Sequence, residues 1–258
     1  LASKASALVA VVAIFLAVAA LWCMGYQLLD GTVALEPALY VKGLALLGAG
    51  FVLLGWLSLA LQVYANHKFV GYLLTIGIIV SQMVLAALDF DHNLVAFAGT
   101  PATPYSDMNG YGHFLVGWGW FALHWTLFTL AALVLAAPFW VRGTPEPWRR
   151  RAGIALSRLR GGQGALFAGL VLATIGSGAW ILYNTTVLNR YRASDTALDE
   201  QAAYEKTWRG EEDRAQPRIL AVDARVDIFP EERRVLIDGH YRMHNPTAEA
   251  IPELLVYL

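Results

Sequence analysis

FLVGWGWFALHWTLFTLAALVLAAPFW, residues 114–140, is the stretch from which the fold follows. It contains no Asp, Glu, Lys or Arg. The hydrocarbon core of a bilayer is about 30 Å thick, and a helix of roughly 20 apolar residues crosses it. A lone apolar strand would leave its backbone groups unpaired in lipid, so a helix is the expected conformation. Residues 114–140 are therefore predicted to span a membrane.

Similar apolar runs lie on both sides of this stretch, at residues 5–24, 40–64, 70–88 and 164–183. The whole composition agrees with a membrane protein. Hydrophobic residues make up 57% of the chain and charged residues 15%, against about 25% charged residues in an ordinary soluble domain. We expect about five transmembrane helices within residues 1–184, which makes this part of the chain a membrane all-α domain bound to the lipid bilayer.

The two loops that flank residues 114–140 predict the orientation. The following loop, 141–163, has six arginines and a single acid, Glu146, whereas the preceding loop, 89–113, has three aspartates and no Lys or Arg. Basic loops stay in the cytoplasm and acidic loops are free to cross. The remaining loops alternate consistently, so we expect the N-terminus inside and the C-terminus outside.

The arginine-rich loop admits two interpretations. Its apolar residues are interspersed with arginines, which is typical of an amphipathic segment attracted to anionic lipid. The alternative is a surface that docks a cytoplasmic partner. The residues that would form this docking surface are Arg149, Arg150, Arg151, Arg158 and Arg160.

His124 lies well inside the predicted fourth helix. An ionisable residue at this depth suggests a role in transport or gating. A neutral histidine can also bridge neighbouring helices by a hydrogen bond, and this packing role is the favoured interpretation. A stripe of small residues in the fifth run predicts close helix packing, within the chain or against a partner such as a second copy. Its members are Gly169, Ala173, Gly176 and Ser177.

Metal-binding residue types gather in the loop 89–113. A site could be imagined from them, but their spacing fits no known ligand signature, and turns and helix capping explain them better. These residues are Asp89, Asp91, His92, Asp107 and His113. The single cysteine, Cys23, cannot form an internal disulfide or a cysteine metal site. We therefore assign no metal, cofactor-binding or catalytic residue in the chain.

The chain becomes polar after Tyr183. Residues 185–217 are expected to form a linker with a short helix, and residues 218–258 the first strands of a β-domain. Apolar residues recur at every second position over 218–228 and again over 235–243, with a Pro-Glu-Glu turn between them. A third strand is predicted from residue 251. Because so few strands cannot enclose a core, we expect the beginning of an extracytoplasmic β-sandwich in a longer polypeptide.

Three segments carry a resemblance to a known family. They are TPATPYSDMNGYGHF at 100–114, WILYNTTVLNRYRASD at 180–195 and RVDIFPEERRVLIDGHYRMHNPT at 225–247. Together they resemble bacterial ABC-2-type transporter permeases fused to a gluzincin-class zinc aminopeptidase. The resemblance implies that residues 1–184 are permease helices and that the hairpin begins the amino-terminal β-sandwich of the peptidase.

The resemblance implies the membrane part of an ATP-driven transporter in the bacterial inner membrane, with its C-terminal segment in the periplasm. The ATP-binding subunit would be a separate chain, since no G-x-x-x-x-G-K-[ST] motif is present. Zinc and its ligands would lie beyond Leu258. Two alternatives remain: the membrane anchor of a zinc aminopeptidase, and a non-enzymatic scaffold. The discriminating feature is an H-E-x-x-H helix downstream. A basic face with interleaved aromatics is missing, so nucleic acid is not an expected partner.

Overall fold

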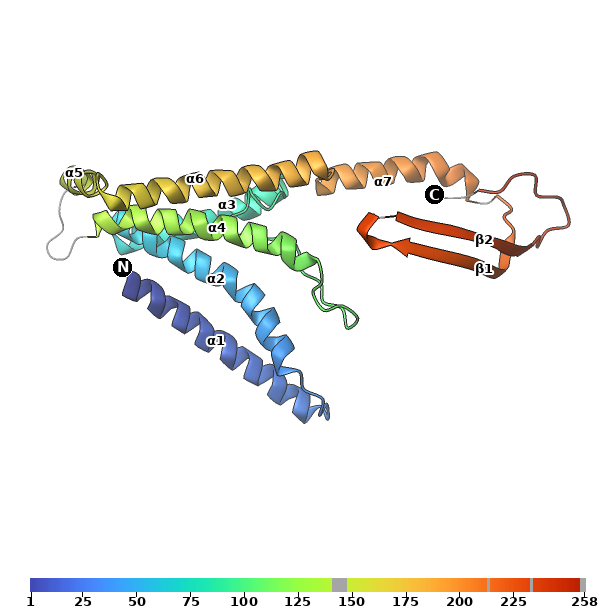
Figure 1. The fold of residues 1–258 in the computed structure, drawn as a ribbon, viewed down its shortest axis with the longest axis horizontal. Coiled ribbons are helices and arrows are strands. Elements are labelled where there is room, and N and C mark those ends of the chain that lie inside the picture. Colours follow the sequence, from blue (N-terminus) through green and yellow to red (C-terminus); the bar gives the residue numbers. More distant parts are fainter. Residues whose placement is uncertain (141–147, 213, 233, 256–258) are drawn as a thin grey trace. The chain divides into compact units, whose positions relative to one another are not determined.

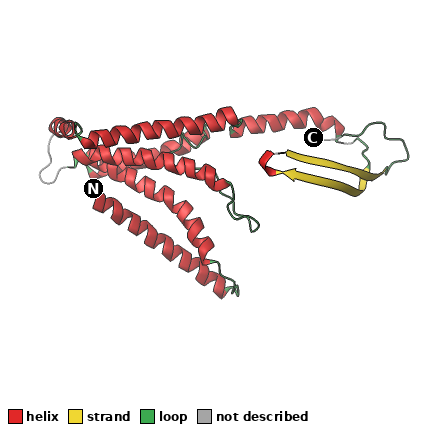
Figure 2. Cartoon of the chain, viewed as in Figure 1, coloured by secondary structure: helices red, strands yellow, loops and turns green. Residues whose placement is uncertain are grey.

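The computed structural model describes residues 1–140, 148–212, 214–232 and 234–255. Two compact units are present, Leu1–Asp195 and Thr196–Leu258. The first unit is helical, and the second contains a small antiparallel sheet (Figures 1 and 2). The boundary between the units falls later than the predicted end of the membrane domain at residue 184. The reason is that the chain between Tyr183 and Ser194 is bonded to the loop that follows the third helix.

In the described part of the chain, five helices are long and apolar enough to cross a membrane, which supports an integral membrane protein. Their positions agree with the five predicted runs, although most extend further at one or both ends. They are α1 (Ala2–Leu29), α2 (Pro37–Ala65), α3 (Lys68–Ala87), α4 (Phe114–Ala136), continued by the 3-10 turn η1 (Ala137–Phe139), and α6 (Gly162–Leu182), continued by the π-helical turn η2 (Tyr183–Leu188).

A two-residue turn joins α2 to α3. Asn66 takes the left-handed conformation (φ 50°) that ends α2, His67 is extended, and α3 begins at Lys68. The two helices then approach so closely that a Cβ on Gly71 would lie 2.9 Å from the Cα of Gln62. Only glycine fits this contact without a shift of backbone. The turn thereby places the end of α2 beside the start of α3.

The buried core of the helical unit lies between α2 and α4. Ala60 and Val63 of α2 pack against Leu133 and Ala136 of α4. In contrast, α1 and α3 each bury only one residue, Ala20 and Gly71 respectively. The apolar side chains that α1 and α3 leave exposed would be unfavourable in water, whereas a lipid bilayer is a suitable solvent for them.

Polar side chains tie these helices together within the apolar layer. The Trp56 indole donates to the Ala5 carbonyl at 3.1 Å and the Tyr64 hydroxyl donates to the Ala132 carbonyl at 2.7 Å, joining α2 to α1 and to α4. Such bonds contribute roughly 1 kcal/mol each in membranes. They place the N-terminus, the α2–α3 turn and the end of α4 at one end of the bundle, where α5 (Trp148–Arg158) also lies (Figure 1). We call this the cationic end, and the opposite end the acidic end.

The second unit contains most of α7 (Ser194–Trp208), the turn η3 (Arg209–Glu211) and a hairpin. Strand β1 (Arg218–Phe229) pairs antiparallel with β2 (Arg234–His244), with a register irregularity at Leu220. The connection begins with the turn η4 (Pro230–Glu232). Both predicted strands and the turn between them are confirmed.

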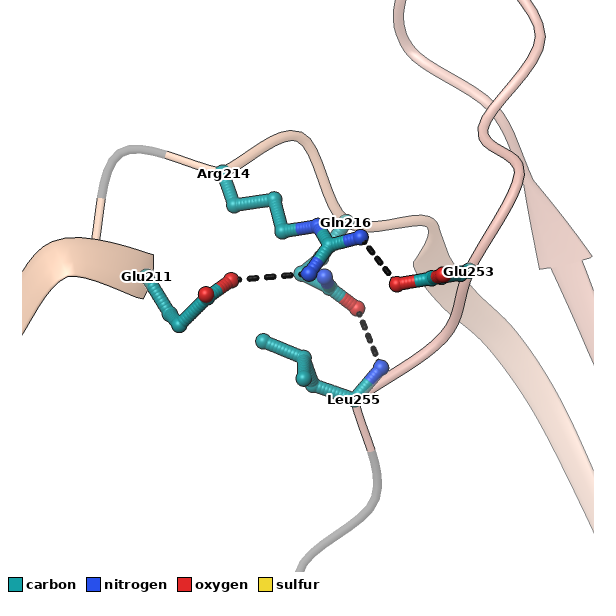
Figure 3. A network of polar contacts seen from close by, with 5 residues as sticks. All are labelled: Glu211, Arg214, Gln216, Glu253 and Leu255. Atoms are coloured by element: carbon teal, nitrogen blue, oxygen red, sulfur yellow. Dashed lines mark hydrogen bonds and ion pairs between the residues drawn. The ribbon is translucent and has the colours of Figure 1, made fainter. Parts of the chain in front are cut away.

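The prediction of a third strand from residue 251 is wrong for the described part, because residues 251–255 are not in a strand; residues 256–258 lie outside the described residues. Pro252 cannot donate to a β-ladder. Other polar bonds hold the segment instead (Figure 3): the Arg214 guanidinium bridges Glu211 and Glu253, and the Leu255 amide donates to the Gln216 side chain at 3.2 Å.

The hairpin has one apolar and one polar face. Pairs such as Val226–Ile237 and Val222–Tyr241 share the apolar face, and Asp223–His240 and Arg225–Asp238 share the other. The apolar side chains are largely exposed; Ile237, for example, is 66% accessible. A two-stranded sheet is what the structure shows, and a larger sandwich stays a prediction.

Candidate functional site

The cationic end is organised around Arg151 of α5. Arg151 is 3% exposed, and Ala155, one turn later, is 1% exposed, so both lie on the face that α5 turns toward the bundle. The Arg151 Nη2 donates to the carbonyl oxygens of Val63, at 2.7 Å, and Phe139, at 2.9 Å. One guanidinium therefore links α5 to the end of α2 and to the turn that ends α4.

Aromatic stacking supports the same attachment. The Trp148 ring stacks on Phe139, with ring centroids 5.3 Å apart and planes 16° apart, and the Arg151 guanidinium lies 5.9 Å from the Trp148 ring. The Arg158 side chain donates to the Pro138 carbonyl at 3.4 Å. Contacts to Pro138 and Phe139 thus come from both ends of α5, which fixes the helix along its length.

The structure separates the five arginines of the predicted docking surface. Arg151 is buried and holds the helix, and Arg158 is partly engaged by the Pro138 carbonyl. The other four arginines, Arg149, Arg150, Arg158 and Arg160, are exposed. Charge alone could not distinguish Arg151. Its spacing of four from the small apolar Ala155 places these two buried residues on one helical face, and that spacing is the signal in the sequence.

A pocket of about 250 Å³ opens beside Arg151, and we call it the cationic pocket. Its lining comes from four segments: the start of α1, the α2–α3 turn, the end of α4 and α5. Among the lining residues are Lys4, Gln62, His67, Lys68, Trp140 and Arg151. The Lys4 ammonium lies 5.0 Å from the centre of the Trp140 ring.

At the acidic end, the carboxylate of Asp91 joins the loop after α3 to the start of α7. Its Oδ1 accepts a short hydrogen bond from the Tyr191 hydroxyl, and its Oδ2 accepts from the Ser194 backbone amide at 2.9 Å and the Ser194 hydroxyl at 2.5 Å. These donors, with the Ser194 hydroxyl first, lower the pKa of Asp91 to about 2. Partial burial, followed by the bond to Asp91, raises the pKa of Tyr191 to about 12. We call this group the Asp91 clamp.

His92 makes a second link at the acidic end. Its Nδ1 accepts from the Leu94 amide at 3.1 Å, so its Nε2 carries the proton and donates to the Thr185 hydroxyl at 3.3 Å. Thr185 belongs to the π-helical turn, a geometry often found at functional positions. Burial lowers the pKa of His92, while the nearby Asp91 carboxylate opposes this. Neutral His92 therefore joins the loop after α3 to the end of α6.

Metal-binding residue types at the acidic end do not converge. Asp91 and His92 bond to the segment after α6, whereas Asp107, within the Ser106–Gly110 bridge, and His113, after it, are exposed on the later part of the loop. Within the described residues no three His, Cys, Asp or Glu side chains come close enough to hold a metal ion. The favoured interpretation is an ordered loop with helix capping. In the structure, Asp91 of this loop caps the first residue of α7.

His124 connects α4 to α6 in the middle of the bundle. Its Nδ1 lies 3.1 Å from the Ser177 hydroxyl, which itself donates to the Thr174 carbonyl at 3.0 Å. The histidine is therefore the donor in the bond to Ser177. A Cβ on Gly178 would lie 3.0 Å from the His124 ring, so the small residue admits the imidazole. This is the interhelical hydrogen bond that the packing interpretation expects. From the small-residue stripe, Ser177 is buried in this contact, whereas Gly169 and Gly176 face open space.

These polar clusters share one property: each joins elements that are distant in sequence. Through these bonds the movement of one helix or loop can be passed to another. None of the clusters pairs a nucleophile with a base. The Asp91 clamp could not be predicted from the sequence, because the residues that bond to Asp91 are about a hundred positions away. The chain matches no protein-family model, no curated protein and no solved structure.

Proposed function

We propose that the chain is the membrane-spanning permease part of an ATP-driven transporter, linked to an extracytoplasmic aminopeptidase-like domain. Three features support the proposal: the five apolar helices, the family resemblance of the segments at 100–114, 180–195 and 225–247, and the asymmetry of charge between the two ends. The observation that carries it is the attachment of α5 to the ends of α2 and α4 through Arg151.

An ATP-driven permease must transmit the movement of a cytoplasmic ATPase to helices within the membrane. A short amphipathic helix that is attached to two membrane helices and carries exposed charge is suited to this task. Helix α5 has both properties, because Arg151 and Trp148 hold it while Arg149 remains exposed, as does Arg160 just after the helix. The docked partner would be acidic where it meets these arginines, which favours fast and specific association.

In this proposal the cationic end lies in the cytoplasm and the acidic end outside, in the bacterial inner membrane. The bias of Lys and Arg toward one set of loops is the physical reason. The α7 helix and the hairpin would then belong to the periplasmic side, where the resemblance also puts the peptidase-like region. Zinc and its ligands would belong to that downstream region, and no step of peptide hydrolysis is assigned to residues of this chain.

A second candidate function is the membrane anchor of a zinc aminopeptidase without transport. The observation that favours it is the exposed apolar face of the β1–β2 hairpin, which suits the edge of a larger β-domain. In that case the membrane helices would hold a peptidase near the bilayer, and α5 would serve only as an interfacial helix.

Co-purification from native membranes separates the two functions. We expect the affinity-tagged full polypeptide to carry an ATP-hydrolysing subunit, and Arg149→Glu with Arg160→Glu to remove most of the co-purified ATPase activity. The matched control, Arg209→Glu with Arg218→Glu, makes the same charge change on exposed residues of the second unit and should retain the activity. Wild-type protein that hydrolyses no ATP would contradict the transporter and favour the anchor. An equal loss in both variants would contradict docking on α5.

A further inference from the structure

The cationic pocket concentrates positive charge without a matching acid. Lys4, Lys68 and Arg151 line it, and no Asp or Glu is among its described lining residues. The hydrogen bonds of the Arg151 side chain go to two neutral carbonyls, and its Nε has no partner within the described part of the chain. A buried cation is expensive unless an anion or good acceptors compensate it. A bound anion would therefore stabilise the positive charges of the pocket.

The backbone adds to the positive potential. Helix α3, of 20 residues, begins at Lys68, on the wall of the pocket, and no side chain among the described residues caps its N-terminus. The first amide groups of a helix are donors without intrahelical acceptors, and the helix dipole makes this end electropositive. An anion in the pocket would have Lys68 and these amide groups on one side and Lys4 on another.

The size and surroundings of the pocket favour a lipid headgroup. A volume of about 250 Å³ is below the roughly 300–1,000 Å³ of sites that enclose a whole drug-sized ligand, so a group of headgroup size fits best. The pocket lies where membrane helices end, and large apolar side chains beside it remain exposed, with Phe69 65% and Trp148 55% accessible. Aromatic side chains at this level mark the membrane interface, where acyl chains would cover them.

We propose that the cationic pocket binds the phosphate group of an anionic phospholipid from the adjacent leaflet. The phosphate lies between Lys4, Lys68 and the N-terminus of α3, near the buried guanidinium of Arg151. The acyl chains extend along the exposed apolar surfaces beside Phe69 and Trp148. The lipid thereby joins the start of α1, the α2–α3 turn and α5, and the site stands whether or not the chain transports anything.

Native mass spectrometry of the full chain in a neutral detergent tests the proposal. The protein is titrated with phosphatidylglycerol, and separately with phosphatidylcholine of the same acyl chains, with and without an excess of inorganic phosphate. The test variant is Lys4→Gln with Lys68→Gln, two exposed residues that line the pocket; the first replacement also removes the contact of Lys4 with the Trp140 ring. The matched control, Arg209→Gln with Arg218→Gln, removes the same charge from exposed residues of the second unit that do not line the pocket.

We expect wild type and control to bind phosphatidylglycerol in preference to phosphatidylcholine, and the Lys4/Lys68 variant to bind it about tenfold or more weakly. Excess inorganic phosphate should not displace the lipid. Displacement by phosphate would overturn the lipid as the occupant in favour of a soluble anion. Equal loss in test and control variants, or no preference in wild type, would overturn the site.

Discussion

At each end of the helical bundle one charged side chain links separate segments, but this side chain is buried at one end and partly exposed to water at the other. At the cationic end, Arg151 is buried and donates to two backbone carbonyls. At the acidic end, Asp91 is partly exposed and accepts from Tyr191 and Ser194. Arg151 bonds to Val63, 88 residues earlier, and Asp91 bonds to Ser194, 103 residues later. Similar hydrogen bonds therefore contribute differently to the free energy of unfolding, because water competes with them only at the acidic end.

The largest expected effect is at the buried link. Arg151→Met would leave the Val63 and Phe139 carbonyls without their donor, and we expect it to destabilise the helical unit by about 3 kcal/mol. Thermal unfolding in detergent measures the change. The control Arg149→Met, two positions earlier and exposed, should change stability by less than about 0.5 kcal/mol. Equal losses of stability in the two variants would contradict the claim that the buried bonds of Arg151 hold the cationic end.

A second prediction concerns the packing that positions Val63. Gly71→Ala would force a Cβ to within 2.9 Å of the Gln62 Cα, so we expect a loss of about 1–3 kcal/mol. Gly77→Ala, in the same helix, has open space around the new Cβ and should be neutral or slightly stabilising. The same unfolding experiment compares them. If Gly71→Ala were as stable as Gly77→Ala, the close approach of α2 and α3 would be refuted.

A smaller and more local effect is expected at the acidic end. Asp91→Asn keeps the shape of the side chain but removes its charge, and it should raise amide hydrogen exchange at residues 192–196 and 89–93. The midpoint of thermal unfolding should move by at most about 2 °C. The pKa of Asp91 is lowered, so its contribution is present above pH 3.8 and is lost as the pH falls toward about 2. A large loss of global stability in Asp91→Asn would show that the clamp matters as much as Arg151.

The smallest effect is a dependence of the acidic end on pH. The pKa of His92 is lowered, so folding favours the neutral imidazole, and its contribution is complete above its ordinary pKa of 6.5. As the pH falls below 6.5 toward the lowered pKa, the unfolded state binds more protons and the link to Thr185 weakens. Exchange protection at residues 183–188 should decrease over this range, after correction for intrinsic rates. In His92→Gln the decrease should be absent; if it persists, His92 is not its cause.

Hydropathy and alternation predicted most of the fold. Residues 114–140 and the four other apolar runs became the five long helices because lipid requires each span to satisfy its own backbone. The two strands followed from their period of two. The third strand was predicted wrongly because the alternation of apolar residues takes no account of Pro252 or of local polar contacts such as that of Leu255 with Gln216. Propensity describes a segment alone, whereas a strand also needs a partner edge.

The candidate sites were less predictable than the helices. The charge of the loop after α4 identified its arginines as a group, but burial of Arg151 depends on carbonyls that other elements supply. His124 could be recognised from its depth in an apolar run, and its partner Ser177 could not. The Asp91 clamp and the cationic pocket arise from segments far apart in the chain. Without the fold, no local pattern brings those segments together.

The most direct test of the account is the orientation of the two ends in the membrane. With Cys23→Ser as background, Asp107→Cys reports the acidic end and Arg160→Cys the cationic end. A membrane-impermeant maleimide is applied to right-side-out membranes. We expect labelling of Asp107→Cys in sealed membranes, and of Arg160→Cys only after permeabilisation. The reverse pattern would put α5 outside, beyond the reach of a cytoplasmic ATPase, and would contradict the proposed transporter.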